Sequence, residues 1–547
     1  MSTFATREPQ MFPVLSAAQV ETAKRFASGP ARHFGAGEQV YAIGEQNAPA
    51  WLVQEGTIEV VRRAGLSAEV PVTTHRAGQF TGEVNQLAGR PSIAAGHAGS
   101  QGCSALPFDA AHLRALMVGS AEIGEIVMRA LILRRVGLIE EGAAGTILIG
   151  APGSPDIIRL QEFLTRSGYP NLVLDGATDA EGQVMIERLG VLADELPLVV
   201  CPTGTLLKNP SPTELARCLG ITPTLDPEKL YDVAIVGAGP AGLAAAVYAA
   251  SEGLSVIVLD ERTVGGQAGA SSRIENYLGF PTGISGQALA GRAFNQAMKF
   301  GAEIAIPLAV ERLDCAGDPL ALVLSGNSRV RTGVIVIASG ARYRRLDVPN
   351  LEVFEGAGVS YWASPIEARL CAGEDIALVG GGNSAGQAVV FLAPQVKRLH
   401  LIVRRPLAAT MSRYLIDRIA ALPNVEIHVG TEIAALEGER ATGLRGVTCR
   451  SRADGTLKHH VLRHLFLFIG ADPNAEWLAG CVETNDKGFV VTGAGALPLE
   501  TNQPGVFAIG DVRAGSTKRV AAAVGEGAAV VAQIHATIAA RTGKGDA

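Results

Sequence analysis

Apolar and polar positions follow two different patterns in the first part of the chain. In residues 33–104, short apolar runs alternate with a period of two between regular glycine turns, which predicts an all-β unit. In residues 107–140, apolar positions recur at helical spacing, which predicts helices. We therefore expect a first domain, residues 1–140, in which a β-roll is followed by helices.

Residues 141–225 alternate strand and helix patterns and end in a hairpin and a helix. TILIG is typical of a buried strand, SPDIIRLQEFLTRSG of an amphipathic helix, and LPLVVCPTGTLL of a hairpin. This order predicts a small α/β domain. Residues 221–229, ITPTLDPEK, are rich in Pro and Thr and are expected to be a linker.

A third pattern begins with an apolar strand at residues 231–236, which runs into Gly237-x-Gly239-x-x-Gly242 and an alanine-rich helix. In a dinucleotide-binding fold these glycines allow a tight turn, a close approach to the diphosphate, and close packing of helix on strand. The next strand ends at Asp260, where a carboxylate can accept a hydrogen bond from a ribose hydroxyl. The alternative is a glycine turn in an ordinary α/β domain.

The same pattern occurs again in DIALVGGGNSAGQAVVFL, with Gly380-x-Gly382-x-x-Ala385 between strand and helix. Two phosphate cradles predict two dinucleotides. After the next strand there is no acid, and Arg404 and Arg405 follow instead, which favours a 2′-phosphate and therefore NADPH. The alternative is exposed charge at the end of a strand.

Composition narrows these expectations. The 547 residues suggest three or four domains, and a net charge of -6 gives no basic excess that would favour nucleic acid or anionic lipid. The N-terminal twenty residues do not resemble a signal peptide, and no apolar run reaches about 18 residues, so we expect a cytoplasmic protein with no membrane segment.

Seven cysteines are spread over the chain without any Cys-x-x-Cys spacing. The absence of this spacing argues against structural zinc and against a local redox disulfide. Most of the thiols are therefore expected to be free and buried. They are Cys103, Cys201, Cys218, Cys315, Cys371, Cys449 and Cys481.

The first domain resembles a cyclic-nucleotide-binding domain. The resemblance rests on Gly37-Glu38, Gly44, Gly56 and the cassette Gly78-x-Phe80-x-Gly82-Glu83. Ser92 and Ile93 occupy the positions where the family has its phosphate-binding arginine, and Arg90 comes too early. We favour a degenerate pocket in a docking module over a true cyclic-nucleotide sensor.

The small α/β domain resembles a thioredoxin fold. Leu196-Pro197 stands where that family has its cis-proline, and Ser154-Pro155-Asp156-Ile157 replaces the redox Cys-x-x-Cys. Without those two thiols the domain cannot exchange a disulfide by the family's route. Two interpretations remain, an adaptor and a spacer, and we favour the spacer.

Residues 230–547 resemble the low-molecular-weight thioredoxin reductase family. The resemblance adds Gly265-Gly266-Gln267, Asn276, Ala338-Ser339-Gly340-Ala341 and Gly510-Asp511 to the two cradles. It implies an FAD domain at 230–345 and 465–547 with an NADPH domain at 346–464 between its halves. The implied FAD residues are Gly237, Gly239, Gly242, Asp260, Gln267, Asn276, Gly510 and Asp511, and the implied NADPH residues are Gly380, Gly382, Asn383, Ser384, Ala385, Arg404 and Arg405.

The chain departs from this family where its redox cysteines should be. Gly358-Val359-Ser360 is followed by a segment in which Trp362 and Pro365 replace both cysteines. Cys371 is the nearest thiol and is either packed or a lone redox group. Trp362 either stacks on the flavin or packs in the core. Trp362 and Cys371 are therefore the two catalytic candidates.

The leading hypothesis is an NADPH-dependent FAD oxidoreductase, multidomain α/β in fold with an N-terminal β-roll, that passes electrons to a non-dithiol acceptor. A non-catalytic nucleotide-sensing or partner-binding flavoprotein and a thioredoxin-disulfide reductase with a non-standard thiol are the alternatives. The electron acceptor is expected to be a small molecule or a protein, and the resemblance suggests a homodimer.

Overall fold

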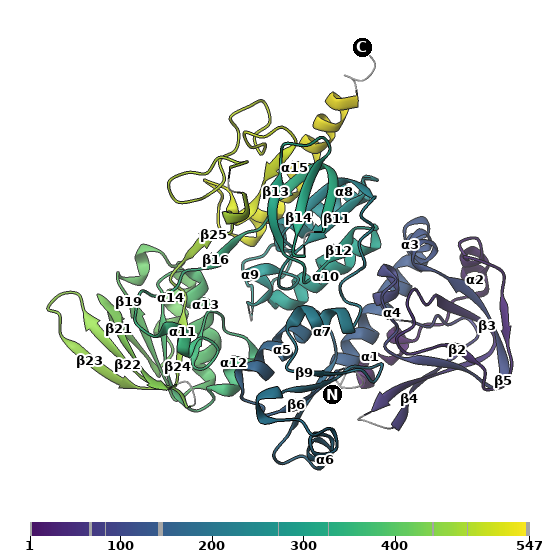
Figure 1. Cartoon of the computed structure of the whole chain (residues 1–547), viewed down its shortest axis with the longest axis horizontal. Helices are drawn as coiled ribbons and strands as arrows, with labels where there is room; N and C mark the ends of the chain where they lie inside the picture. The colour runs from purple at the N-terminus through teal and green to yellow at the C-terminus, as the bar shows by residue number, and fades with distance from the viewer. Residues whose placement is uncertain are drawn as a thin grey trace.

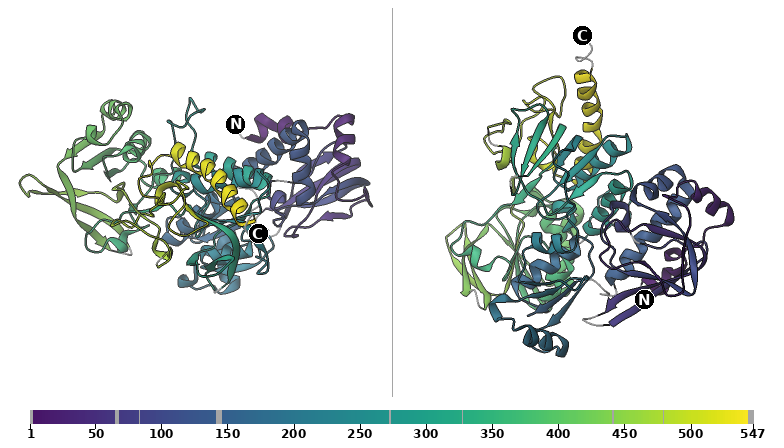
Figure 2. Two further views of the ribbon diagram at one scale, coloured as in Figure 1. Left: turned by 90° about the horizontal axis from the view of Figure 1, so that it is seen from above. Right: turned by 45° about the vertical axis from the view of Figure 1, so that its right-hand side comes forward.

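The computed structural model describes residues 3–64, 68–82, 84–140, 146–271, 273–326, 328–439, 442–478 and 480–542. The chain forms an N-terminal unit, a small α/β unit and two larger α/β units, which Figure 1 shows in purple, blue, teal with yellow, and green. The N-terminal unit and the second large unit lie at opposite ends of the long axis in Figure 2.

The N-terminal unit is a five-stranded antiparallel sheet followed by two helices, as the sequence predicts. Strand β5 continues to Phe108, so the helical region starts slightly later than expected, at Ala110, where the Asp109 side chain caps the helix by accepting from the His112 amide. Its elements are α1 (Thr3–Met11), α2 (Ala17–Lys24), β1 (Arg32–Phe34), β2 (Gln39–Tyr41), β3 (Ala50–Ala64), β4 (Ala68–Arg76), η1 (Val84–Ala88), β5 (Ala95–Phe108), α3 (Ala110–Gly119) and α4 (Ala121–Glu140).

The small α/β unit has a four-stranded sheet in the order β7-β6-β8-β9. Helices α5 and α7 cover the face that carries Leu148 and Val199, and α6 covers the opposite face. The Leu196–Pro197 peptide bond is cis. The elements are β6 (Thr146–Gly150), α5 (Pro155–Arg166), β7 (Asn171–Asp175), α6 (Ala180–Leu189), η2 (Ala193–Glu195), β8 (Leu198–Val200), β9 (Leu206–Lys208) and α7 (Pro212–Cys218).

The first Rossmann unit has a seven-stranded sheet in the order β12-β11-β10-β15-β14-β13, with β26 paired to β15. Its α8 begins at the first glycine motif and packs against the C-terminal α15. The elements are β10 (Leu230–Val236), α8 (Pro240–Ser251), β11 (Val256–Leu259), α9 (Gly266–Gly269), α10 (Gly286–Lys299), β12 (Glu303–Ala305), β13 (Val310–Asp314), β14 (Leu320–Leu324), β15 (Arg329–Ile337), η5 (Glu476–Leu478), β26 (Val506–Ala508), η6 (Gly510–Val512) and α15 (Val520–Thr542).

Helix α15 corrects the expectation that no apolar segment is long enough to span a membrane. By length and composition it is a candidate membrane span, which is weak evidence for a membrane helix. In the structure Val530, Val531 and Ile534 are buried in the core that α15 shares with α8. A Cβ on Gly527 would lie 2.5 Å from the carbonyl oxygen of Ala241, so the two helices cross at close contact. Packing inside the protein thus explains the buried apolar positions of α15, which are 28% of its apolar window.

The second Rossmann unit has a five-stranded parallel sheet, β17-β24-β18-β19-β20, and a three-stranded antiparallel sheet, β21-β22-β23. The ribbon formed by β16 and β25 connects it to the first unit. The elements are β16 (Ala341–Tyr343), α11 (Leu351–Phe354), β17 (Val359–Ser360), α12 (Pro365–Leu370), β18 (Asp375–Val379), α13 (Asn383–Leu392), η3 (Ala393–Gln395), β19 (Arg398–Val403), η4 (Leu407–Ala409), α14 (Arg413–Ala420), β20 (Val425–Val429), β21 (Thr431–Glu439), β22 (Gly443–Ser451), β23 (Leu457–Val461), β24 (His464–Leu467) and β25 (Ala471–Pro473).

The expected domain boundary at residue 465 is wrong by a few residues. It falls inside β24, whose pairing with β17 and β18 places the whole strand in the second Rossmann sheet. The strand is apolar on both faces because helices such as α13 and α14 cover one face of this parallel sheet and the three-stranded sheet covers the other. Its composition alone does not indicate which of the two sheets it joins.

The expectation of mostly free cysteines is also wrong. Disulfides join Cys201 to Cys218 and Cys315 to Cys481, and Cys103, Cys371 and Cys449 are free and buried. The paired cysteines are 17 and 166 residues apart in sequence, so only the fold brings them together. Their spacing therefore carries no local motif.

Candidate functional site

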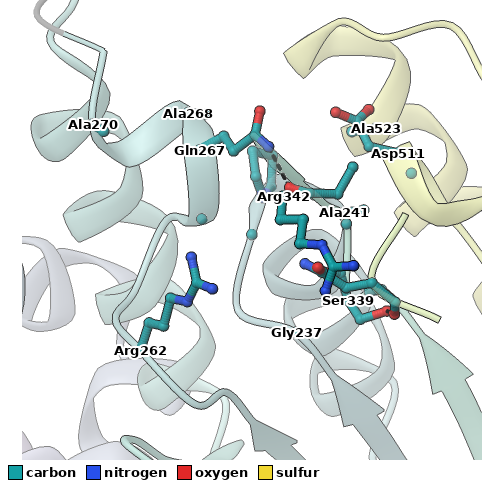
Figure 3. A pocket seen from close by; sticks show the side chains of 18 of the residues that line it. Gly237, Ala241, Arg262, Gln267, Ala268, Ala270, Ser339, Arg342, Asp511 and Ala523 are labelled. Atoms are coloured by element: carbon teal, nitrogen blue, oxygen red, sulfur yellow. Dashed lines mark hydrogen bonds between the residues drawn. The ribbon is translucent and has the colours of Figure 1, made fainter. Parts of the chain in front are cut away.

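A cavity of about 760 Å³ opens at the carboxyl ends of β10, β11 and β15. This is the position where open α/β sheets bind ligands, and the volume is within the range of small-molecule and cofactor sites. Residues from the first Rossmann unit form most of its wall, and parts of α5, of the segment before α12 and of α13 close it. Figure 3 shows a pocket of this unit with Gly237, Gln267 and Asp511.

The three glycines of the first motif differ in the space that a side chain would have. A Cβ on Gly237, whose φ is +116°, would lie 2.1 Å from the Ala338 carbonyl oxygen, and one on Gly242 would lie 1.9 Å from the Gly237 carbonyl oxygen. A Cβ on Gly239 would meet nothing closer than 4.0 Å and would extend into the cavity wall. The residues therefore fit a cradle in which the free space at Gly239 and the start of α8 receive a diphosphate.

Asp260 lies directly after β11 and lines the cavity. Its Oδ2 accepts from the Ala238 amide at 2.8 Å and its Oδ1 from the Arg262 amide at 2.9 Å. Burial raises the pKa of this carboxyl above its usual value. An ionised carboxylate has about four acceptor positions, so the two amides leave capacity for ribose hydroxyl groups.

The remaining residues predicted for FAD also line the cavity. They are Gln267, Asn276, Gly510 and Asp511. The Gln267 side chain donates to the Ala341 carbonyl oxygen, which Figure 3 shows as a dashed line. Burial raises the pKa of Asp511, whose backbone oxygen accepts from the Lys518 side chain. The structure thus brings together residues that lie up to 274 positions apart in the chain, from Gly237 to Asp511.

Sequence reasoning missed the cations of this cavity, which are Arg166, Arg262, Arg273, Arg342, Lys518 and Arg519. Arg166 comes from the small α/β unit, and its Nη2 donates to the Gly266 carbonyl oxygen at 2.8 Å. Its Nη1 lies 3.3 Å from Glu162, whose pKa burial raises. Nothing in the local sequence of α5 indicates this contact, because it depends on how two separate domains pack. The cations complement an anionic ligand.

The second motif forms a cradle of the same kind. A Cβ on Gly380, whose φ is +148°, would lie 2.4 Å from the Phe468 carbonyl oxygen, whereas one on Gly382 would meet nothing within 4 Å. Ala385 is fully buried. Asn383 and Ser384, at the start of α13, line the large cavity, but the other residues of the motif do not.

Arg404 and Arg405 directly follow β19 and are exposed. Neither forms an ion pair or hydrogen bond with another residue in the described part of the chain, and neither lines the large cavity. Their guanidinium groups are therefore available to a ligand at the edge of the second cradle.

Trp362 lines the cavity at the start of the segment that leads into α12. Its Nε1 donates to Glu367 Oε1 at 3.0 Å, and Glu367 Oε2 accepts from the Ser364 amide at 2.9 Å. The capping box of α12 therefore holds the indole against the cavity. Sequence reasoning left Trp362 between core packing and the flavin pocket, and the structure places it in the cavity wall.

Cys371, the other catalytic candidate, is fully buried and does not line the cavity. Burial raises the pKa of its thiol to about 11, which disfavours the reactive thiolate. Among the described residues of the cavity wall there is no cysteine, so both disulfides lie elsewhere.

The pocket expected in the N-terminal unit is small. Its volume is about 60 Å³, and Ser92 and Ile93 are part of its wall. Arg134 donates to the carbonyl oxygens of Met11 and Gly82 at 2.7 and 2.8 Å and lies 5.2 Å from the Phe12 ring centroid. Glu83 of the expected cassette lies outside the described residues.

A family profile described as pyridine nucleotide-disulphide oxidoreductase matches residues 231–527. The chain is 33% identical over 305 residues to NADPH-dependent thioredoxin reductase 3 of Arabidopsis thaliana, covering 55% of this chain and 57% of that protein. It is 31% identical over 310 residues to a thioredoxin reductase of Streptomyces clavuligerus, covering 56% of this chain and 94% of that protein.

The matched region thus spans a little over half the length of the Arabidopsis thaliana protein and nearly all of the Streptomyces clavuligerus enzyme. Among solved structures, the crystal structure of Lactococcus lactis thioredoxin reductase matches with a TM-score of 0.53 and 27% identity, covering 56% of this chain and 99% of that one. The N-terminal unit and the small α/β unit lie outside the region that the family profile matches.

Proposed function

The chain belongs to the pyridine nucleotide-disulphide oxidoreductase family, as a flavoprotein of thioredoxin reductase type, and on this premise we propose that it passes electrons from NADPH through FAD to an acceptor other than a protein dithiol. The observation that carries the proposal is the cavity wall, in which Trp362 is present and a cysteine is not among the described residues.

The residues of the first cradle fit FAD. When bound, FAD supplies two-electron chemistry between a reduced nicotinamide and a second substrate. The amides at Gly239 and the start of α8 bind the diphosphate, and Asp260 accepts from the ribose. The arginine and lysine side chains of the cavity wall offset the charge of the diphosphate.

The residues of the second cradle fit NADPH. Gly382 leaves room for the diphosphate, and Arg404 and Arg405 supply the cations that a 2′-phosphate requires. Asn383 and Ser384 face the large cavity, so α13 begins on the side of the second unit that is turned to the flavin site. Such an arrangement suits transfer of electrons between the two nucleotides.

A dithiol acceptor needs a reactive thiol pair next to the flavin. Trp362 and Pro365 occupy the positions at which the thioredoxin reductase resemblance places these cysteines. Cys371 is buried, and its raised pKa keeps it protonated at neutral pH. The preferred acceptor is therefore a small oxidant such as a quinone, or a protein that accepts one electron at a time.

We further propose that the N-terminal unit is a degenerate cyclic-nucleotide-binding-like domain and that the small α/β unit is a thioredoxin-like spacer without the redox pair. The small pocket supports the first proposal. The Arg166 contact with Gly266 supports the second, because it gives the unit a fixed position against the FAD site. We expect a homodimer, which light scattering can test.

The experiment is anaerobic reduction followed by a screen of acceptors. NADPH is expected to bleach the flavin absorbance, and DCPIP or a quinone to restore it with repeated turnover. Thioredoxin with DTNB is expected to give no turnover. The variant Cys371→Ala is the control and should keep the wild-type rate.

Three results would contradict this assignment in different ways. Failure of NADPH to bleach bound flavin favours a non-catalytic flavoprotein. Bleaching without turnover for any acceptor also favours that alternative. Thioredoxin-dependent turnover that disappears in Cys371→Ala favours a disulfide reductase with a non-standard thiol.

A further inference from the structure

A cluster of histidines lies in the second Rossmann unit, outside the large cavity. His400 is on β19, and Glu426 and His428 are on β20. His400 pairs directly with Glu426 in the sheet, and His428 is two residues further along the same strand. Since side chains two residues apart on a strand share a face, this register places all three on one face of the sheet.

The ligand atoms of these three side chains converge. His400 Nδ1 lies 3.1 Å from His428 Nε2 and 3.3 Å from Glu426 Oε2, and the last two atoms are 3.9 Å apart. A tetrahedral zinc ion with bonds of about 2.0–2.1 Å requires ligand atoms about 3.3 Å apart. The three separations lie around that value, so one ion can reach all three atoms with small side-chain movements.

The surroundings also suit a metal ion. His400 is buried, whereas His428 and Glu426 are partly exposed and leave a path for an ion from solvent. Arg398 is 3.2 Å from Glu426 Oε1, which leaves Oε2 facing the histidines.

A third histidine covers the inner side of the cluster. His460 is on β23 of the three-stranded sheet, and its ring centroid lies 4.4 Å from that of His400 and 5.4 Å from that of His428. It packs against His400 and can hold that ring in place, but it is not among the residues whose ligand atoms lie within 4.8 Å of one another. Lys458 and Arg398 are nearby cations that a bound ion would have to tolerate.

We propose that His400, Glu426 and His428 form a binding site for a divalent transition-metal ion, with Zn²⁺ as the best match, and that water completes its coordination. Imidazole with carboxylate is a ligand set that suits zinc. None of the four residues lines the cofactor cavity. The ion would join β19 to β20 at the edge of the parallel sheet, which is a structural role separate from electron transfer.

Zinc titration of the EDTA-treated full-length flavoprotein by calorimetry tests this proposal. The expected result is one Zn²⁺ per chain, with affinity reduced by at least about 10-fold in His428→Gln and in Glu426→Gln, because losing a ligand costs at least as much as losing its supporting partner. Both side chains are partly exposed, and the retained flavin absorbance reports on folding of each variant.

His459→Gln is the matched control. His459 neighbours His460 on β23, but its Nε2 lies 3.1 Å from Glu437 and it takes no part in the cluster. This variant is expected to bind zinc as the wild type does. The proposal is overturned if the wild type binds no zinc, if both cluster variants bind it with unchanged affinity, or if His459→Gln weakens binding as much as His428→Gln.

Discussion

Two regions of this molecule have the glycine signatures of nucleotide pockets, and the structure gives them very different volumes. The first Rossmann unit has a cavity of about 760 Å³, whereas the N-terminal unit has one of about 60 Å³. In both regions glycines with positive φ form the expected turns, among them Gly237 in the first and Gly82 in the second. The backbone signature is therefore present in both, and only one region has space for a nucleotide.

The difference comes from side chains outside the glycine motifs. In the N-terminal unit Arg134 from α4 is buried, donates a hydrogen bond to the Gly82 carbonyl oxygen and packs on Phe12. Both side chains line the small pocket and take up space that a ligand would need. In the Rossmann unit the wall opposite the glycines combines apolar side chains such as Trp362 and Trp477 with arginine and lysine side chains, and it leaves an open space. A motif thus fixes a turn, and distant segments decide whether a ligand fits beside it.

The largest effect is expected from closing the open cavity with Gly239→Val. Its side chain would enter the space reserved for the diphosphate without a backbone clash, because a Cβ there meets nothing closer than 4.0 Å. The purified variant should fold but lose nearly all flavin absorbance.

The matched variant Gly382→Val fills the second cradle instead. It should keep its flavin and lose rapid reduction by NADPH. A full flavin content in Gly239→Val would show that the first cradle does not hold the cofactor.

The sequence predicts the candidate cofactor residues of the first Rossmann unit in detail because their signals are local. The glycines, Asp260 and Gly510-Asp511 each mark the end of a strand, and parallel strands end at one edge of a sheet. Arg166 and the two disulfides could not be predicted in this way, because each contact joins segments that only the packed fold brings together. The placement of β24 failed for the same reason.

The next largest effect is expected for nucleotide preference. Arg404→Ala and Arg405→Ala each remove a cation proposed to bind the 2′-phosphate, and a hydrogen bond to a charged group contributes about 1.5–3 kcal/mol. The KM for NADPH should therefore rise about 10- to 100-fold, while the KM for NADH should stay nearly constant. Stopped-flow reduction of the flavin measures both.

Arg413→Ala is a suitable control for nucleotide preference. Arg413 is also an exposed arginine of the second unit, but it pairs with Asp417 on α14. An equal loss of affinity for NADPH and NADH in the Arg404 and Arg405 variants would rule out a role in selecting the phosphate.

A smaller effect is expected on the stability of the N-terminal unit at acidic pH. His75 lines this pocket, and burial, with help from the charge of Arg134, lowers its pKa well below 6.5 in the folded state. The unfolded state therefore binds the proton more readily, so the stabilisation is present above pH 6.5 and is lost as the pH falls below it. The loss should not exceed about 1.4 kcal/mol per pH unit.

Hydrogen exchange at the amides of β3, measured from pH 7 to pH 5 and corrected for intrinsic rates, checks this loss of stability. His75→Gln removes the titrating group and should flatten the dependence in β3. The wild-type and variant profiles would coincide if His75 were not responsible.

The last prediction is that the N-terminal pocket binds no cyclic nucleotide. It tests whether lack of space or lack of a cation prevents binding. Calorimetry with cyclic AMP and cyclic GMP should give no binding heat, since small-molecule sites have about 300–1,000 Å³ and this pocket has about 60 Å³. Ser92→Arg places a cation where cyclic-nucleotide-binding domains have their phosphate-binding arginine. It should also give no binding heat, because Phe12 and Arg134 still occupy the pocket. Micromolar binding by Ser92→Arg alone would mean that the missing charge, and not the missing space, separates the two regions.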